Sequence, residues 1–258
     1  MDLQLKDKVI IVTGGAKGIG EGIVRVLAAE GAVPVIIGRS KEDNNRLVDD
    51  LSNIAKVYQF VAELTKPDEC EAVVKAIVQQ FGKIDGVVNN AGVNDGVGLE
   101  SGNYTAFMES LHRNLVHYYL IVHHALPQLI KSKGAIVNIG SKTAETGQGN
   151  TSAYAASNGG RNALTREWAV ELLKYGIRVN AVIVAECFTP LYEKWIQTLP
   201  NPEEKLKDIT SKIPLENRMT STEEIAAMVA FLLSSKSSHT TGQLIHVDGG
   251  YVHLDRAL

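Results

Sequence analysis

Hydrophobic and polar positions along this chain are grouped in two kinds of segment that follow one another. Short continuous apolar runs are typical of strands buried on both faces of a sheet, and apolar residues recurring every three or four positions are typical of amphipathic helices. The runs that predict strands are residues 9–13, 33–37, 57–61, 84–88, 135–139, 178–184 and 244–247. The segments that predict helices are residues 18–30, 44–53, 67–81, 104–130, 152–174, 189–199, 202–211 and 223–233.

Strands that alternate with helices indicate an α/β protein. We expect a single doubly wound, Rossmann-type parallel sheet of about seven strands with helices on both faces, forming one domain over residues 1–258. The segment 186–216 differs, because it is richer in Pro, Lys and Glu and follows the sixth predicted strand. Ligands of open α/β sheets bind beyond the carboxyl ends of strands, so this segment is predicted to be a substrate lid. The alternative is a solvated surface excursion.

Composition excludes several classes of partner. The formal net charge is −3 and no basic run is present, so nucleic acid and acidic membrane surfaces are not expected partners. No apolar run approaches the ~20 residues that a spanning helix needs. Two cysteines in 258 residues indicate no disulfide framework and favour a reducing compartment, so we expect a cytoplasmic protein.

The turn after the first predicted strand has the features of an anion site. Thr13 and Gly14 end the strand, and Gly18 and Gly20 open the next helix. Unpaired N–H groups and the helix dipole favour a phosphate at such a helix start. Glycines let the backbone turn tightly and approach a ligand closely. By itself, the trio is also compatible with an ordinary strand-to-helix turn.

The spacing Thr-Gly-x-x-x-Gly-x-Gly resembles the first turn of the short-chain dehydrogenase/reductase family. Two further stretches extend the resemblance over the whole chain: Asn-Asn-Ala-Gly at 89–92 and Val-Asp-Gly-Gly at 247–250. The resemblance implies a nicotinamide nucleotide as cofactor and no metal. The residues expected to contact the nucleotide are Gly14, Lys17, Gly18, Ile19, Gly20, Arg39, Glu63, Asn90, Ala91, Gly92 and Thr189.

The end of the second predicted strand bears on which nucleotide binds. An acidic residue there would bond the ribose 2′-OH, but this chain has Gly38, Arg39 and Ser40. Arg39 can direct two N–H groups to a 2′-phosphate, and Lys17 adds a second cation from the glycine turn. The sequence therefore favours NADP, and NAD remains open.

The resemblance also implies a catalytic group. Ser141 follows the fifth predicted strand and Tyr154 comes thirteen residues later, as in the family. A tyrosinate would take the proton of a substrate hydroxyl while a hydride leaves, and the Ser hydroxyl would hold the substrate oxygen. Asn114 matches a helical Asn that anchors a chain of water molecules in the family.

One position departs from the family pattern. The family has Tyr-x-x-x-Lys, whereas this chain reads Tyr154-Ala-Ala-Ser-Asn158. One helical turn brings position 158 onto the face of Tyr154, where Asn158 can bond a ribose hydroxyl but carries no charge. Lys142, next to Ser141, is expected to point away and is not assumed to substitute. Oxidation is therefore predicted to be slow near neutral pH and to rise with pH.

Within the family, the stretches 90–96, 141–152, 164–170 and 248–254 resemble bacterial L-fucose dehydrogenases. The resemblance implies oxidation of an L-fucose-like aldose at its anomeric carbon to a lactone. Polar groups suited to a sugar are Asn94, Glu145, Gln148, Asn150 and Glu186, and Trp195 could stack on an apolar sugar face.

Other readings stay open. The enzyme could act on another polyol or on a keto acid, and Asn158 favours a non-catalytic NADP-binding protein. The apolar helices 104–130 and 152–174 predict a homotetramer, because these helices pair between subunits in the family.

Overall fold

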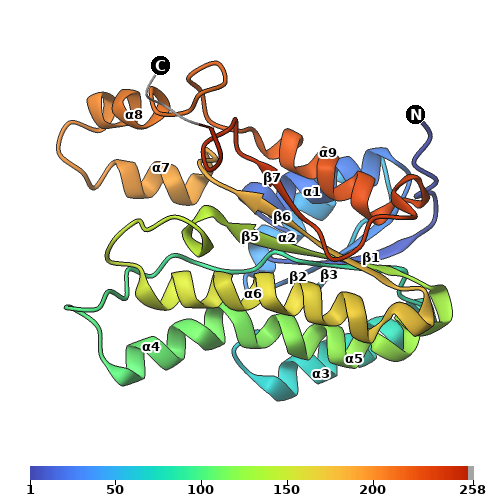
Figure 1. The fold of residues 1–258 in the computed structure, drawn as a ribbon. Helices are drawn as coiled ribbons and strands as arrows, with labels where there is room; N and C mark the ends of the chain where they lie inside the picture. The colour runs from blue at the N-terminus through green and yellow to red at the C-terminus, as the bar shows by residue number, and fades with distance from the viewer. Residues whose placement is uncertain (255–258) are drawn as a thin grey trace.

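The computed structural model describes residues 1–254, and its centre is a parallel sheet (Figure 1). Within these residues the sheet has seven strands in the order β3-β2-β1-β4-β5-β6-β7, which confirms the predicted fold class. The strands are β1 (Val9–Thr13), β2 (Val33–Gly38), β3 (Tyr58–Val61), β4 (Gly86–Asn89), β5 (Ala135–Ser141), β6 (Arg178–Val184) and β7 (Leu244–Val247).

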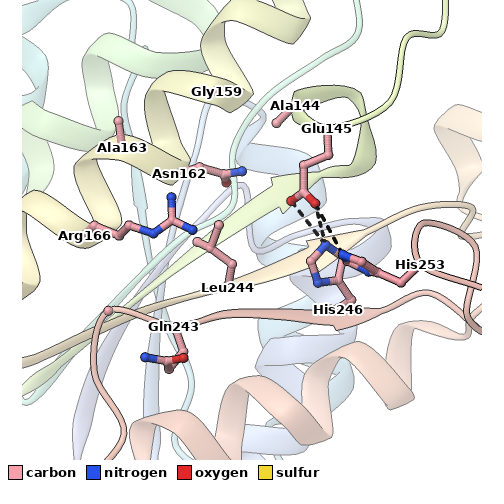
Figure 2. Close-up of a pocket in the computed structure, with 11 residues that line it drawn as sticks. Ala144, Glu145, Gly159, Asn162, Ala163, Arg166, Gln243, Leu244, His246 and His253 are labelled. Carbon is pink, nitrogen blue, oxygen red and sulfur yellow. Dashed lines mark hydrogen bonds and ion pairs between the residues drawn. The ribbon is translucent and has the colours of Figure 1, made fainter.

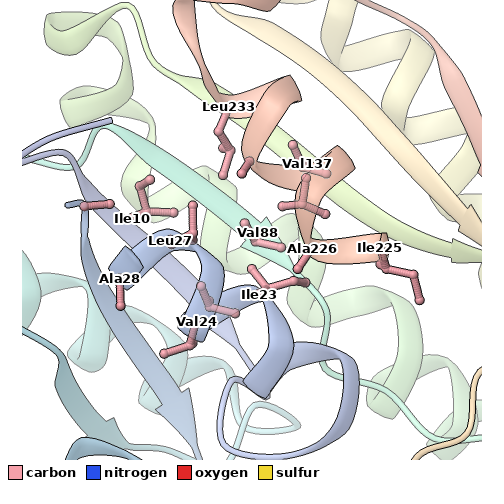
Figure 3. Packing of buried hydrophobic residues seen from close by; sticks show 14 of the residues in the cluster. Ile10, Ile23, Val24, Leu27, Ala28, Val88, Val137, Ile225, Ala226 and Leu233 are labelled. Atoms are coloured by element: carbon pink, nitrogen blue, oxygen red, sulfur yellow. The ribbon is translucent and has the colours of Figure 1, made fainter. Parts of the chain in front are cut away.

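Helices cover both faces of the sheet, and each face has its own apolar core. One face carries α1 (Gly18–Ala29), α2 (Lys41–Leu51) and α9 (Thr222–Leu233). The other carries α3 (Pro67–Phe81), α4 (Tyr104–Leu111), α5 (His117–Ser132) and α6 (Ser152–Glu171). Figure 3 shows Ile23 and Leu27 of α1 beside Ala226 of α9 above the sheet. Burying a side chain such as Ile23 or Leu27 contributes about 1.5–3 kcal/mol.

The strand order determines where a ligand can bind along the edge of the sheet. From β1 the chain proceeds outward to β2 and β3, and it then returns to add β4 on the other side of β1. The crevice between β1 and β4 is thus the switch point at which α/β sheets bind ligands. Thr13 and Asn89 end the two strands that border this crevice.

Two predicted helices are interrupted in the structure. The single helix predicted over 104–130 is wrong in detail, because a π-helical turn at His112–Val116 separates α4 from α5. The helix predicted over 152–174 ends at Glu171, and a 3₁₀ turn, Leu173–Tyr175, follows. Helix α2 begins three residues earlier than predicted because Ser40 caps it, accepting a hydrogen bond from the Asp43 N–H at 3.2 Å.

The segment after β6 leaves the sheet and returns to it. It forms the short helices α7 (Pro190–Ile196) and α8 (Pro202–Thr210), and no residue of α8 is buried. Backbone bonds from Thr220 to Glu186 (3.0 Å) and from Leu215 to Gly249 (3.0 Å) hold its ends. Within residues 1–254, no helix is both long and apolar enough to cross a membrane.

Candidate active site

The glycine turn forms a cradle that side chains would fill. Gly14 and Gly18 have φ values of +63° and +55°, in the left-handed region that favours glycine. A Cβ on Gly20 would lie 2.2 Å from the carbonyl oxygen of Gly14. Thr189, the residue before α7, packs against Gly18, so two predicted nucleotide contacts from distant parts of the chain meet here. The cradle fits a nucleotide pyrophosphate at the start of α1.

Hydrogen bonds to Thr13 connect the glycine turn to the segment that follows β4. The Thr13 hydroxyl oxygen accepts hydrogen bonds from the N–H groups of Asn90 (2.9 Å) and Ala91 (3.1 Å). In return, the amide of Asn90 donates to the carbonyl oxygens of Thr13 (3.0 Å) and Gly14 (3.2 Å). Asn90 therefore serves to hold the floor of the crevice.

Asn114 lies inside the π-helical turn and is fully buried. Its side-chain oxygen accepts a hydrogen bond from the Val93 N–H at 2.7 Å, and its amide donates to the Ser110 carbonyl at 3.0 Å. A π-helical turn changes the spacing of backbone hydrogen bonds and often marks a functional position. Here it places Asn114 directly against Gly92, where a Cβ would lie 2.9 Å from the Asn114 side-chain oxygen.

Ser141 and Tyr154 occupy the neighbouring edge of the sheet. Ser141 ends β5, and its hydroxyl oxygen accepts bonds from the N–H (3.3 Å) and hydroxyl (3.1 Å) of Thr143. Tyr154 lies in the first turn of α6, which packs on the short turn that follows Ser141. Asn158 is fully buried one turn later, and its amide donates to the Tyr154 carbonyl oxygen at 2.9 Å.

The two cations predicted to meet a 2′-phosphate have carboxylate neighbours. The Lys17 ammonium pairs with Asp43 at 2.7 Å. Arg39 has an 83 % exposed side chain and lies 4.0 Å from Glu63. The Glu63 carboxylate also accepts a hydrogen bond from the Thr65 N–H at 3.1 Å, so it stabilises its own loop.

Lys142 is buried and forms an ion pair with Glu186, so its charge has a carboxylate partner of its own. Its ammonium also lies 4.0 Å from the centre of the Tyr251 ring. Burial raises the pKa of Tyr192 well above its usual range, and the neighbouring negative charge of Glu186 raises it further. This cluster of Lys142, Glu186, Tyr192 and Tyr251 places polar groups next to Ser141, and of its four members the sequence had assigned only Glu186 to a site.

Comparisons with known proteins agree with this geometry. The family described as enoyl-(acyl carrier protein) reductase matches residues 14–252. A 3-oxoacyl-[acyl-carrier-protein] reductase of Thermotoga maritima is 36% identical over 97% of this chain and 100% of its own length. The L-fucose dehydrogenase of Bos taurus is 33% identical over 97% of this chain and 91% of its own. The chain belongs to the short-chain dehydrogenase/reductase family.

Solved structures of this family have the same fold. The crystal structure of Cj0485 dehydrogenase is 47% identical, with a TM-score of 0.95, covering 100% of this chain and 99% of that one. The ligand-free aldohexose dehydrogenase of Thermoplasma acidophilum is 31% identical, with a TM-score of 0.88, covering 98% and 97%. Because the chain belongs to this family and has its glycine cradle, it is an oxidoreductase that binds a nicotinamide cofactor.

Glu145, a predicted substrate contact, faces a cavity that neither Ser141 nor Tyr154 lines. Its carboxylate lies 3.1 Å from His246 of β7 and 4.0 Å from His253 (Figure 2). The cavity, about 790 Å³ in volume, lies between α6 and β7. Among the described residues that line it, none belongs to the glycine turn, and neither Ser141 nor Tyr154 is present.

The other predicted substrate residues lie on exposed loops and on α7. Asn94 accepts a hydrogen bond from the Gly96 N–H at 3.3 Å, and Gln148 is exposed. Asn150 packs against Gly98, so the loops after β4 and β5 lie side by side. Trp195 is 43% exposed and packs edge to face on Tyr192, with ring centres 5.1 Å apart.

Arg161 is a further residue at this site that sequence analysis missed. It follows Tyr154 by seven positions on α6, and only 3% of it is exposed. Seven residues are two helical turns, so Arg161 shares a face with Tyr154 and Asn158. That spacing was visible in the sequence, but a charged residue at such a position is usually solvated.

Proposed function

We propose that this chain is an NADP-dependent dehydrogenase that oxidises an L-fucose-like aldose at its anomeric carbon to the lactone. The observation that carries the proposal is that Tyr154 lies in the first turn of α6, which packs on the turn after Ser141, with the polar cluster of Lys142, Glu186, Tyr192 and Tyr251 next to Ser141. The names of two relatives, an L-fucose dehydrogenase and an aldohexose dehydrogenase, support a sugar substrate.

The chemistry assigns different tasks to the two catalytic side chains. The Ser141 hydroxyl holds the oxygen on the anomeric carbon. The Tyr154 phenolate takes the proton of that hydroxyl, so that the oxygen becomes the carbonyl oxygen of the lactone. The bound nicotinamide supplies the hydride acceptor. Glu186 and Tyr192 offer an acceptor and a hydroxyl to the remaining sugar hydroxyls, and a site built to bond hydroxyls rejects substrates that lack them.

The segment 186–216 acts as the lid of this site. Its helices α7 and α8 bury little apolar surface, so opening them costs little free energy. The lid also carries Glu186 and Trp195, and closing it over a sugar would exclude water from the reacting atoms. The chain thus forms one domain with this insertion.

NADP is the proposed nucleotide because Arg39 stands exposed at the end of β2, where a 2′-phosphate would be directed. A guanidinium can bond a phosphate with two N–H groups. Lys17 would join it by exchanging its pair with Asp43 for the phosphate.

A substrate panel tests the proposal. Purified protein is mixed with aldoses, polyols and keto acids, with NADP and NAD in separate series, and reduced nucleotide and lactone are measured. We expect turnover of L-fucose and of sugars that share its ring stereochemistry, with lactone formed in step with NADPH. The 36% identical acyl reductase favours a ketone reductase instead, which reduction of keto substrates without aldose oxidation would show. Tight nucleotide binding without turnover of any substrate would indicate a binding protein.

Two further features of the proposal concern assembly and location. Tyr119 of α5 and Val170 of α6 are 49% and 67% exposed, which suits helix pairing in a homotetramer. A monomer in sedimentation at micromolar concentration would contradict this assembly. Cys70 and Cys187 are free, and burial raises the pKa of their thiols to about 11 and about 12, as suits a protein kept reduced in the cytoplasm.

A further inference from the structure

The guanidinium of Arg161 is buried among neutral groups behind Tyr154. Its Nε donates to the Asn114 carbonyl at 2.7 Å. Its Nη1 donates to the Ile139 carbonyl at 3.2 Å and to the side-chain oxygen of Asn158 at 3.0 Å. Its central carbon lies 4.4 Å from the centre of the Tyr118 ring and 6.0 Å from that of Tyr154. Elements β5, α5, α6 and the π-helical turn together fix its position.

This charge has no counter-ion among residues 1–254. No carboxylate of the described chain lies within ion-pair distance of Arg161, although a buried charge is costly unless it is paired. Its Nη2 is also buried and lacks an acceptor there. A Cβ on Gly92 would lie 2.8 Å from Nη2, so this open donor lies at the nucleotide-binding segment. The buried Arg161 guanidinium therefore brings an unpaired positive charge and an unbonded N–H group, on Nη2, to the segment at Gly92.

Two other cations near the crevice have close carboxylate partners. Lys142 is paired with Glu186, and Lys17 is paired with Asp43. The titratable groups that face Arg161 are Tyr154 on its own helix and His117 and Tyr118 on α5.

The neighbours of Arg161 respond to its charge in the expected directions. Burial, together with the positive charge of Arg161 and against the hydrogen bond to the Arg113 carbonyl, lowers the pKa of His117 to about 4. Burial raises the pKa of Tyr118 to about 12, against the opposing effect of the same charge. Both neighbours therefore remain neutral near pH 7, and Arg161 is the charged member of this buried group.

We propose that Arg161 is a positioning residue that supplies, from two turns along α6, the positive charge that the family places at position 158. Helical side chains lean toward the N-terminus, so the long Arg161 side chain reaches back toward Tyr154. Asn158 is then the residue that orients it, through the bond to Nη1. The guanidinium is charged at every working pH and favours the tyrosinate form of Tyr154. This proposal rests on the proposed oxidoreductase function and replaces the expectation of slow turnover at neutral pH.

The main test is the pH dependence of kcat in four proteins: wild type, Arg161→Gln, Arg161→Gln with Asn158→Lys, and the control Arg166→Gln. Arg166 is an exposed arginine on the same helix. We expect Arg161→Gln to move the rising limb of the profile upward by about one pH unit or more and to lower kcat at pH 7 about ten-fold. Arg166→Gln should leave the profile in place. The double variant should restore it, because Lys at position 158 returns a cation to Tyr154.

A structural role for Arg161 predicts different results. Loss of packing would lower kcat equally at every pH, and adding Lys at position 158 would not restore it; either result overturns the proposal. Asn158→Lys alone gives a test that does not depend on the folding of an Arg161 variant. If Arg161 already supplies the charge, the profile of Asn158→Lys stays within about three-fold of wild type. A gain of about ten-fold at pH 7 means that wild type lacks a cation and contradicts the proposal.

A spectroscopic readout separates this proposal from the proposed function. The ultraviolet absorbance of tyrosinate is titrated in wild type and in Arg161→Gln, each compared with its Tyr154→Phe counterpart to isolate the signal of Tyr154. We expect ionisation of Tyr154 to require a higher pH in Arg161→Gln. An unchanged titration contradicts the role of Arg161 even if the enzyme is active, and a shifted one supports it even if the substrate panel finds no turnover.

Discussion

Lys142 and Arg161 are both buried cations next to the proposed catalytic pair, but their charges are balanced in opposite ways. Lys142 follows Ser141 and has a carboxylate partner, Glu186. Arg161 lies behind Tyr154 and bonds only carbonyl and amide oxygens among the described residues. The ion pair of Lys142 with Glu186 joins the end of β5 to the first residue of the lid segment. The charge of Arg161 stays uncompensated among the described residues, beside the tyrosine that must be a phenolate to accept the substrate proton.

The difference shows how one fold can use buried charge for structure and for chemistry. A paired charge has little effect on a third group, because the field of its partner cancels much of its own. An unpaired charge in the interior retains its effect on a neighbour, at a cost in stability that hydrogen bonds only partly offset. The predictions that follow perturb the two cations and their neighbours, beginning with the largest effect.

Tyr154→Phe removes the group on which Arg161 is proposed to act. Loss of a general base lowers kcat by about 10³-fold, whereas nucleotide affinity should stay within about two-fold because the ring remains in place. Combining Tyr154→Phe with Arg161→Gln should cost nothing further, since two residues that act together are not additive. A further ten-fold loss in the double variant would show that Arg161 acts through another group.

Glu186→Gln converts Lys142 into a second buried cation without a counter-ion. Removing one member of a largely buried pair costs about 3 kcal/mol of unfolding free energy, to be measured by urea denaturation. The matched control is Glu186→Gln combined with Lys142→Met, which removes both charges and should recover most of the loss. If the single variant loses less than about 0.5 kcal/mol, Lys142 reaches water and its pairing contributes little.

Protonation of His117 would place a second positive charge in the buried region that holds Arg161, and its pH dependence can be measured. Burial holds the pKa of His117 at about 4, whereas an unfolded imidazole titrates near 6.5. The unfolded state therefore binds the proton first, so stability is fully present above about pH 6.5 and decreases as the pH falls toward 4. Between pH 7 and pH 5 this amounts to about 2 kcal/mol, and His117→Gln should remove that part of the decrease. An identical acid profile in wild type and variant would mean that His117 is hydrated when protonated.

Arg39 provides the exposed counterpart of the two buried cations. Arg39→Asp should weaken NADP binding about ten-fold or more and leave NAD binding unchanged or stronger, measured by titration of both nucleotides. Lys56→Asp is the control, because Lys56 is exposed at the opposite end of β3. Equal affinity of wild type for the two nucleotides would contradict the NADP assignment.

The sequence by itself determined the sheet and the chemical types at its edge. Mostly apolar runs predicted β1, β6 and β7 with their observed bounds, and the buried β1 and β6 follow the rule that strands covered on both faces are rich in apolar residues. The glycine turn and the interval from Ser141 to Tyr154 were equally readable, since local spacing fixes them. Helix α6 was predicted, but the π-helical turn around Asn114 has no periodicity that distinguishes it from α-helix.

Only the tertiary structure decided which cation serves which group. Lys142 is next to Ser141 in sequence, but its partner Glu186 comes from the end of another strand. Lys17 was predicted to be free for a phosphate, yet it meets Asp43 of α2. Arg161 had the spacing of an ordinary helical residue, and its bonds to Asn114 and Ile139 join it to residues 47 and 22 positions away. Sequence spacing fixes which residues share a helix face or a strand, whereas the balance of a buried charge depends on contacts that form only when distant elements pack together.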